Sequence, residues 1–153
     1  MNLCSDLTVD TTNHQDCSLV VDNISNTIIK NSDIHGSGLF ATDDIEEGSV
    51  LCLLDGQIVS WDSYKKVSTT NLFCQFDDYL FMEWNALDYD VLMIRPFRTK
   101  YSFINHSRSP NTILNRYPLA VLTLRKIYTG EELTLDYRKE PLNKEYVAAA
   151  TYL

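Results

Sequence analysis

Short runs of β-forming residues recur along most of the chain, and turn signals separate them. Asp55-Gly56 and Ser109-Pro110-Asn111 are examples of these turns. The runs lie at residues 18–21, 26–30, 49–54, 57–60, 78–84, 90–94, 101–104, 112–115 and 119–124. Because no long helical pattern alternates with these runs, the sequence predicts a mainly β fold with short helices.

Two short helices are expected beside the strands. The first covers residues 61–70 with Asp62 as its N-terminal cap, and the second covers residues 140–150 with Pro141 near its first turn. A chain of 153 residues suits one domain with its own core. Residues 1–18 are polar and show little periodicity, so we expect them to be loose.

The charge of the chain narrows the class of partner. The net charge is −8, whereas a nucleic-acid binder carries a basic surface. We therefore expect no direct nucleic-acid binding and a basic partner, such as a peptide tail rich in Lys and Arg. Acids between residues 77 and 90, including Glu83, are candidates to receive this tail. A solvated acidic face that serves only solubility explains them equally well.

The hydrophobic and cysteine patterns bear on location and on metals. No apolar run approaches the roughly 20 residues that cross a bilayer, and the first residues are polar and acidic rather than those of a signal peptide. We expect an intracellular protein of the cytoplasm or nucleus, neither secreted nor in a membrane. The cysteines at positions 4, 17, 52 and 74 form no C-x-x-C pair, and the histidines lack metal-ligand spacing. Reduced thiols and no metal are therefore expected.

Two segments, one near the start of the series of β-forming runs and one after its end, carry unusual polar residues. His35-Gly36-Ser37-Gly38 has two glycines one residue apart, which lets the backbone approach a bulky group closely. A plain hairpin turn explains this pair as well. Residues 130–137 read GEELTLDY, with two acids after a glycine and a terminal Asp-Tyr. Taken alone, this segment is explained by an edge strand with a half-buried tyrosine.

A third polar segment follows the apolar run at residues 101–104. Asn105 can donate and accept hydrogen bonds through its amide, and His106 offers a backbone donor and acceptor. Because His106 and Ser107 are neighbours that point to opposite faces of an extended strand, they do not suit serine hydrolysis. Asn105 and Ser107 either meet a ligand or cap the turn that follows.

The order and spacing of these segments resemble the SET domain of S-adenosylmethionine-dependent protein lysine methyltransferases. The matching pieces are GSGLFATDDIEEG at residues 36–48, FINHSRSPN at 103–111 and GEELTLDY at 130–137. The resemblance implies a β-clip fold of small sheets with a C-terminal pseudoknot. It places the SET domain at residues 19–139, with residues 140–153 as a C-terminal helical flank.

The resemblance also implies roles for particular residues. The cofactor is S-adenosylmethionine, which becomes S-adenosylhomocysteine, and no metal is required. Asn105 is expected to bind its methionine part, and the His106 backbone is expected to meet its adenine ring. The cofactor-binding set is completed by His35, Gly36, Ser37, Gly38 and Tyr137. Tyr137 is also the expected catalytic residue, because its hydroxyl would orient the lysine amine.

The lysine channel is where the sequence departs from the family pattern. Leu54 stands where a tyrosine often precedes the glycine, and Leu135 stands where Phe or Tyr is common. A less polar channel of this kind leads to the hypothesis that an already methylated lysine is accepted. No cysteine follows Cys74, so the zinc-binding tail of many relatives is missing. The helix with Tyr146 and Tyr152 is the candidate to cover the channel, although both rings can simply pack that helix onto the sheet.

The sequence therefore predicts a protein lysine N-methyltransferase that acts on a basic protein tail, with a histone tail as one candidate. The alternative is a catalytically weak SET module that binds a protein partner or the cofactor. The missing channel tyrosine at Leu54 favours this alternative, whereas Asn105, His106 and Tyr137 favour the enzyme. The sequence leaves dimerisation open.

Overall fold

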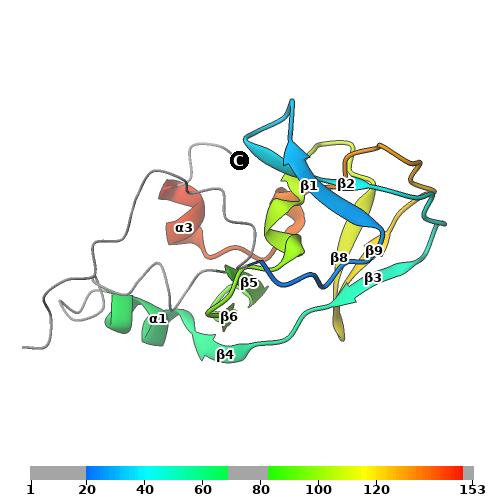
Figure 1. Cartoon of the computed structure of the whole chain (residues 1–153). Coiled ribbons are helices and arrows are strands. Elements are labelled where there is room, and N and C mark those ends of the chain that lie inside the picture. The colour runs from blue at the N-terminus through cyan, green and yellow to red at the C-terminus, as the bar shows by residue number, and fades with distance from the viewer. Residues whose placement is uncertain (1–19, 69–82, 150–153) are drawn as a thin grey trace, which may run out of the picture.

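The computed structural model describes residues 20–68 and 83–149, in which short strands form small sheets (Figure 1). The strands are β1 (Thr27–Asn31), β2 (Ser37–Ala41), β3 (Val50–Leu53), β4 (Gln57–Ser60), β5 (Glu83–Asp88), β6 (Val91–Arg95), β7 (Asn105–His106), β8 (Thr112–Arg116), β9 (Leu119–Thr123) and β10 (Thr134–Leu135). The helices are α1 (Trp61–Ser68) and α3 (Lys144–Ala149), with 3-10 turns η2 (Lys100–Phe103) and η3 (Tyr137–Lys139). The mainly β prediction is thus confirmed.

Three of the sheets are antiparallel and one is parallel. β1 pairs with β2, β9 lies between β3 and β8, and β6 lies between β4 and β5. In Figure 1 the β4–β6–β5 sheet lies beside α1, away from the β3–β9–β8 sheet. The parallel sheet joins β7 to β10 although almost thirty residues separate them. The C-terminal segment therefore lies beside the Asn-His segment, as the expected pseudoknot requires.

The apolar side chains form two clusters that hold these sheets together. The larger one contains residues with no exposed surface, among them Leu39, Val121 and Leu133. The smaller one forms around Trp61 and Leu92 and packs α1 and the chain near Tyr146 onto the β4–β6–β5 sheet. Burial of such side chains is the main favourable term for a fold of short strands. No helix in the described ranges is long and apolar enough to cross a membrane.

Most predicted strands lie within one residue of the observed ones, but the run at 101–104 is wrong. These residues lie in the 3-10 turn η2 and its cap, because the Thr99 hydroxyl accepts a hydrogen bond from the backbone N–H of Tyr101 and bends the chain. β2 was not predicted, and β5 continues past the predicted end at residue 84 to Asp88. Residues 18–19 and 78–82 of two other predicted runs lie outside the described residues, and Val21 forms only an isolated bridge with Thr99.

Both predicted helices exist: α1 begins at Trp61, as predicted, whereas α3 begins at Lys144 instead of residue 140. The Ser60 hydroxyl, rather than Asp62, caps α1 by accepting a hydrogen bond from the Ser63 N–H at 3.1 Å. α3 begins at residue 144, because the Asn143 side chain caps it through the Glu145 N–H at 2.9 Å. Residues 1–18, the helix ends at residues 70 and 150, and Tyr152 lie outside the described residues. The domain boundaries at residues 19 and 139 stay predictions.

Candidate functional site

The Asn105 side chain connects three segments that are distant in the sequence. Its amide nitrogen lies 3.2 Å from the carbonyl oxygens of His35 and Ser37 and 2.8 Å from Oε1 of Glu132. An amide nitrogen carries two hydrogens, so one of them is shared. Among the described residues, none donates a hydrogen bond to the amide oxygen of Asn105. The structure thus brings the glycine segment and the Asn-His segment together and leaves one acceptor for a ligand.

The glycine segment fits tightly against the Glu132 carboxylate. Both oxygens of Glu132 accept hydrogen bonds from the Ser32 hydroxyl, at 2.8 and 2.9 Å. A Cβ atom on Gly38 would lie 2.2 Å from Oε1 of Glu132, so a larger residue would displace this carboxylate. Gly36 has a φ of +49°, which L side chains rarely adopt. The two glycines therefore have different roles: Gly38 allows close packing against Glu132, and Gly36 allows the turn.

His106 and Tyr137 are held together by the parallel pairing of β7 and β10. The Ser107 N–H donates to the Leu135 carbonyl at 2.9 Å, and the Tyr137 N–H donates to Nδ1 of His106 at 3.2 Å. The His106 and Tyr137 rings pack with centroids 5.3 Å apart. The Tyr137 hydroxyl donates to the Ile104 carbonyl at 2.6 Å. Tyr137 is therefore fixed at both its backbone and its hydroxyl.

Asp136 begins the turn η3 that presents Tyr137. Its carboxylate accepts hydrogen bonds from the backbone and side chain of Arg138, at 2.8 to 3.2 Å. These hydrogen bonds from Arg138 lower the pKa of Asp136 to about 2. Asp136 is thus charged at neutral pH and holds the turn, as Glu132 holds the glycine segment.

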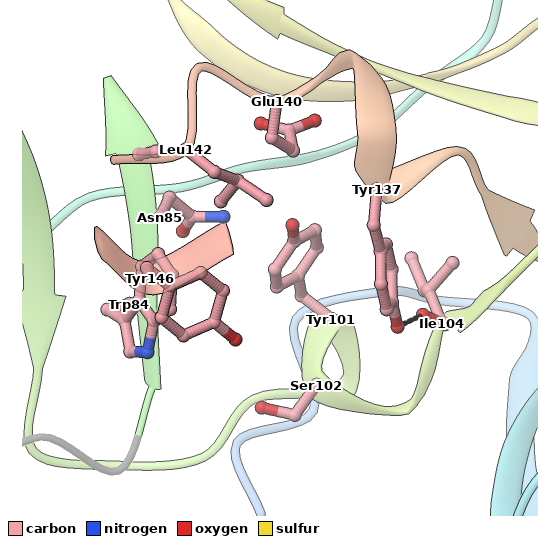
Figure 2. Close-up of a pocket in the computed structure, with 10 residues that line it drawn as sticks. Trp84, Asn85, Tyr101, Ser102, Ile104, Tyr137, Glu140, Leu142 and Tyr146 are labelled. Carbon is pink, nitrogen blue, oxygen red and sulfur yellow. Dashed lines mark hydrogen bonds between the residues drawn. The ribbon is translucent and has the colours of Figure 1, made fainter. Parts of the chain in front are cut away.

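Tyr137 also borders a pocket of about 160 Å³ (Figure 2). It is lined by Trp84, Asn85, Ala86, Tyr101, Ser102, Ile104, Tyr137, Glu140, Leu142 and Tyr146. The Trp84 and Tyr146 rings meet edge to face with centroids 5.0 Å apart. Figure 2 shows the Tyr101 ring between Tyr137 and Tyr146, with its hydroxyl directed toward Glu140. Four aromatic rings and one carboxyl group are features that suit a cation with an apolar stem.

A buried polar network supports the wall of this pocket. Glu83 pairs with Arg95 at 3.0 Å and accepts hydrogen bonds from Thr99 and from the Ser102 hydroxyl. Arg95 also donates to the Asn85 side chain. Glu83 is only 4% exposed, so its predicted availability to a basic tail is wrong. The network instead joins β5 and β6 to the turn η2 that carries Tyr101.

Burial shifts the pKa values of two titratable groups in the pocket. Burial raises the pKa of the Tyr101 hydroxyl well above its usual range, so this group stays protonated. Burial also raises the pKa of Glu140 to about 7, and the positive charge of Arg116 only partly opposes this effect. The pocket therefore contains a carboxyl group that exchanges its proton near neutral pH.

The predicted site residues fall into three groups. We call the place where the Asn105 amide meets His35, Ser37 and Glu132 the Asn105 junction. Six of the predicted residues lie around it, namely His35, Gly36, Ser37, Gly38, Asn105 and His106. Tyr137 and Tyr146 line the aromatic pocket. Leu54 and Leu135 are 6% and 2% exposed and belong to the larger core, outside the lining of this pocket. The roles of all these residues stay predictions.

Sequence reasoning missed Trp84, Tyr101 and Glu140. Tyr101 stands four residues before Asn105, but its prediction as part of a strand hid its position beside Tyr137. Nothing in the sequence distinguishes Glu140 from the other acids of the chain. Within residues 20–68 and 83–149, no group of three or more His, Cys, Asp or Glu side chains is arranged to hold a metal ion.

Comparison with known proteins identifies the family. The model of the SET domain family matches residues 36–138. Histone-lysine N-methyltransferase trithorax of Drosophila virilis is 31% identical over 118 residues, which cover 70% of this chain and 3% of that protein. Putative histone-lysine N-methyltransferase ASHH4 of Arabidopsis thaliana is 28% identical, over 67% of this chain and 30% of that protein. The chain thus spans only a small part of these relatives. Because the match covers well over half of its length, the chain belongs to the SET domain family.

Proposed function

We propose that this protein transfers a methyl group from S-adenosylmethionine to a lysine side chain of a basic protein. The family and the names of the histone-lysine N-methyltransferase relatives support the reaction class. The observation that carries the proposal is the position of Tyr137. Its ring packs on His106 beside the Asn105 junction, and it also lines the aromatic pocket. A residue that borders both sites can act where cofactor and substrate meet.

The Asn105 junction suits the cofactor by the groups it offers. The amide oxygen of Asn105 is an acceptor without a described donor, which fits the ammonium group of the methionine part. The backbone of His106 and of the segment from His35 to Gly38 lies beside it. When bound, the cofactor supplies a methyl group activated by a positively charged sulfur. These residues would hold it.

The aromatic pocket suits the lysine side chain. An alkyl stem gains from apolar contact with Tyr101 and Tyr146, and an ammonium head is attracted by ring faces. A lysine ammonium has a pKa near 10.4 and must lose a proton before it can attack carbon. Because the Tyr137 hydroxyl donates its proton to Ile104, its oxygen acts as an acceptor toward an amine N–H. This contact would orient the nitrogen lone pair for transfer.

The charge of the chain and the names of its relatives support the proposed substrate class. A net charge of −8 favours a basic protein tail. The relatives are named for histone lysines, so a histone tail is the first candidate. Action on a histone would place the protein in the nucleus or cytoplasm.

The second candidate function is a SET module that binds without turnover. Leu54 favours it, because a channel hydroxyl common in the family is missing there. This module would bind S-adenosylmethionine at the Asn105 junction or a protein tail at the pocket, with no methyl transfer.

Transfer of labelled methyl groups to histones and other lysine-rich proteins tests the proposal. Tyr137→Phe should lower the rate on the order of 100-fold, because the amine loses its orienting acceptor. Tyr117→Phe is the matched control, since Tyr117 is 81% exposed. Binding of S-adenosylmethionine, measured by calorimetry, should change less than about twofold in either variant. Binding without any transfer by the wild type would favour the second candidate, and absence of cofactor binding would refute the methyltransferase.

A further inference from the structure

The Glu132 carboxylate accepts hydrogen bonds only from neutral groups in the described part of the chain. The Ser32 hydroxyl donates to both of its oxygens, and the Asn105 amide donates to Oε1 at 2.8 Å. The neighbouring acid, Glu131, is instead paired with the Arg125 guanidinium. Within residues 20–68 and 83–149 no cationic side chain is paired with Glu132. Its negative charge therefore has no described counter-charge, although it lies at the Asn105 junction.

The main chain fixes the position of Glu132 without help from its side chain. The Asn111 side chain donates to the Glu132 carbonyl at 2.8 Å, and the Leu133 N–H donates to the Leu39 carbonyl at 2.8 Å. Glu132 also forms an isolated bridge with Phe40 of β2. Because none of these contacts involves the carboxylate, a change of the Glu132 side chain should leave this segment in place.

Ser32 holds the carboxylate from the hairpin between β1 and β2. Its hydroxyl oxygen accepts a hydrogen bond from the Ile34 N–H at 2.9 Å, and its own N–H donates to the Gly36 carbonyl at 2.9 Å. A serine hydroxyl carries a single hydrogen, and here that hydrogen is directed to Glu132. The carboxylate is thus held by Ser32 on one side and by Asn105 on the other.

The acceptors around the Asn105 amide decide which of its two ends faces outward. The carbonyl oxygens of His35 and Ser37 lie 3.2 Å from the amide nitrogen, and Oε1 of Glu132 lies 2.8 Å from it. Glu132 is the nearest of these three and carries the charge, which makes its hydrogen bond roughly twice as strong as a neutral one. If the amide rotated by half a turn, its oxygen would face three acceptors and lose all three bonds. The amide oxygen is therefore directed away from Glu132.

We propose that Glu132 and Ser32 are positioning residues that fix the Asn105 amide, so that its oxygen accepts a hydrogen bond from the ammonium group of the cofactor. The inference rests on the proposed function, because it needs the methionine part of the cofactor at the Asn105 junction. The Glu132 charge adds a longer-range attraction for the same ammonium group. A ligand without an ammonium group gains from neither effect. The pair of residues therefore gives the site a preference for a ligand that carries this group.

Calorimetry with two matched ligands tests the inference. They are S-adenosylhomocysteine and its deamino analogue, in which a hydrogen atom replaces the ammonium group of the homocysteine part. The preference is the ratio of their dissociation constants, and in the wild type it should favour S-adenosylhomocysteine by at least about 10-fold. Glu132→Gln should lower this preference on the order of 10-fold, because the charge is lost and the amide is held less firmly. Ser32→Ala should lower it about threefold.

Glu131→Gln is the matched control for a merely structural role. It removes the acid next in the chain and the partner of Arg125, so it should lower the free energy of unfolding but keep the ligand preference of the wild type. An equal loss of preference in Glu131→Gln and Glu132→Gln would overturn the inference, because any disturbance of the segment would then suffice.

Two further results would overturn the inference while the proposed function stands. The first is a Glu132→Gln variant whose preference stays within about twofold of the wild type; if this variant does not fold, the same result in Ser32→Ala decides. The second is a wild type that binds both ligands equally, because the ammonium group then contributes nothing. A wild type that binds neither ligand would refute the proposed methyltransferase itself.

Discussion

Glu83 and Glu140 are both withdrawn from water, yet their surroundings are opposite. Glu83 is 4% exposed and lies 3.0 Å from the Arg95 guanidinium. It also accepts hydrogen bonds from Thr99, from both the N–H and the hydroxyl, and from Ser102. Glu140 receives no hydrogen bond from a described side chain or N–H. One acid is fully paired, and the other is left open on the pocket.

The difference separates a structural acid from one that is available to a ligand. A buried charged group is tolerated when its partners are in place. When they are missing, the pKa of the group shifts so that its neutral form is favoured. The Glu83 network joins β5, β6 and the turn η2, so it fixes the wall on which Tyr101 stands. Glu140 supports no such wall. The comparison implies that removal of the two charges has opposite effects on stability.

Glu83→Gln should give the largest loss. It leaves the Arg95 charge buried without its ion-pair partner, which costs about 3–5 kcal/mol in free energy of unfolding. Urea unfolding of the variant, with Glu47→Gln as an exposed control, measures this loss. In the double variant Glu83→Gln/Arg95→Met most of the loss should return, because neither charge is left alone. A single variant within about 1 kcal/mol of the wild type would contradict the structural assignment of Glu83.

Glu140→Gln should instead stabilise the protein, and only at higher pH. The pKa of this carboxyl is 4.5 when unshifted and about 7 in the folded state. Between these values the folded state binds more protons than the unfolded state, so stability falls as pH rises through the folded pKa. Allowing for partial exposure, the wild type loses about 2 kcal/mol by about pH 8 relative to about pH 4. The variant lacks this loss.

Urea unfolding of the wild type and Glu140→Gln at both pH values checks the sign. The difference between the two proteins isolates Glu140, because all other titrating groups are shared. The free energies of unfolding should be nearly equal at about pH 4, and the variant should be more stable at about pH 8. A difference that does not vary with pH would show that Glu140 is an ordinary solvated acid.

The same comparison explains which parts of the site could be predicted from sequence. Asn105, Gly38 and Tyr137 belong to short segments whose residue order is itself informative, and the structure brings Asn105 and the glycine segment together. Strands such as β4 and β8 follow from local pattern and turn residues. These predictions needed only neighbours in the chain.

Glu83 and Glu140 could not be distinguished in this way. The pairing of Glu83 with Arg95 depends on the register of β5 and β6, and its contact with Ser102 depends on the turn η2. The same turn was predicted as a strand, because its apolar run conceals the Thr99 cap. Whether an acid is paired depends on tertiary packing, so the sequence alone could not predict that Glu83 is paired and Glu140 is not.

Gly38→Ala extends the comparison to a third acid, Glu132. A Cβ at this position would lie 2.2 Å from Oε1 of Glu132, so the carboxylate must move away from Asn105 and Ser32. We expect a loss of about 1 kcal/mol in free energy of unfolding, since the hydrogen bonds of a paired acid are disturbed. Weaker binding of S-adenosylmethionine should accompany it. Ser25→Ala, at an exposed position outside the predicted site, is the control, and equal behaviour of both variants would show that Glu132 adapts freely.

The prediction with the smallest expected effect tests directly whether the unpaired carboxylate of Glu140 attracts a cation. n-Butylammonium carries the stem and head of a lysine side chain and should bind the wild type weakly at about pH 8, where Glu140 is charged. At a concentration equal to its dissociation constant, about 100 mM for so small a ligand, it should raise the free energy of unfolding by about 0.4 kcal/mol. n-Butanol, which lacks the charge, and an equal concentration of sodium chloride should do less. The gain should disappear in Glu140→Gln. Glu83, the acid in the pocket wall, cannot replace Glu140 because it is already paired with Arg95. Equal gains in the wild type and the variant would mean that the aromatic rings alone attract the cation and that Glu140 is not its partner.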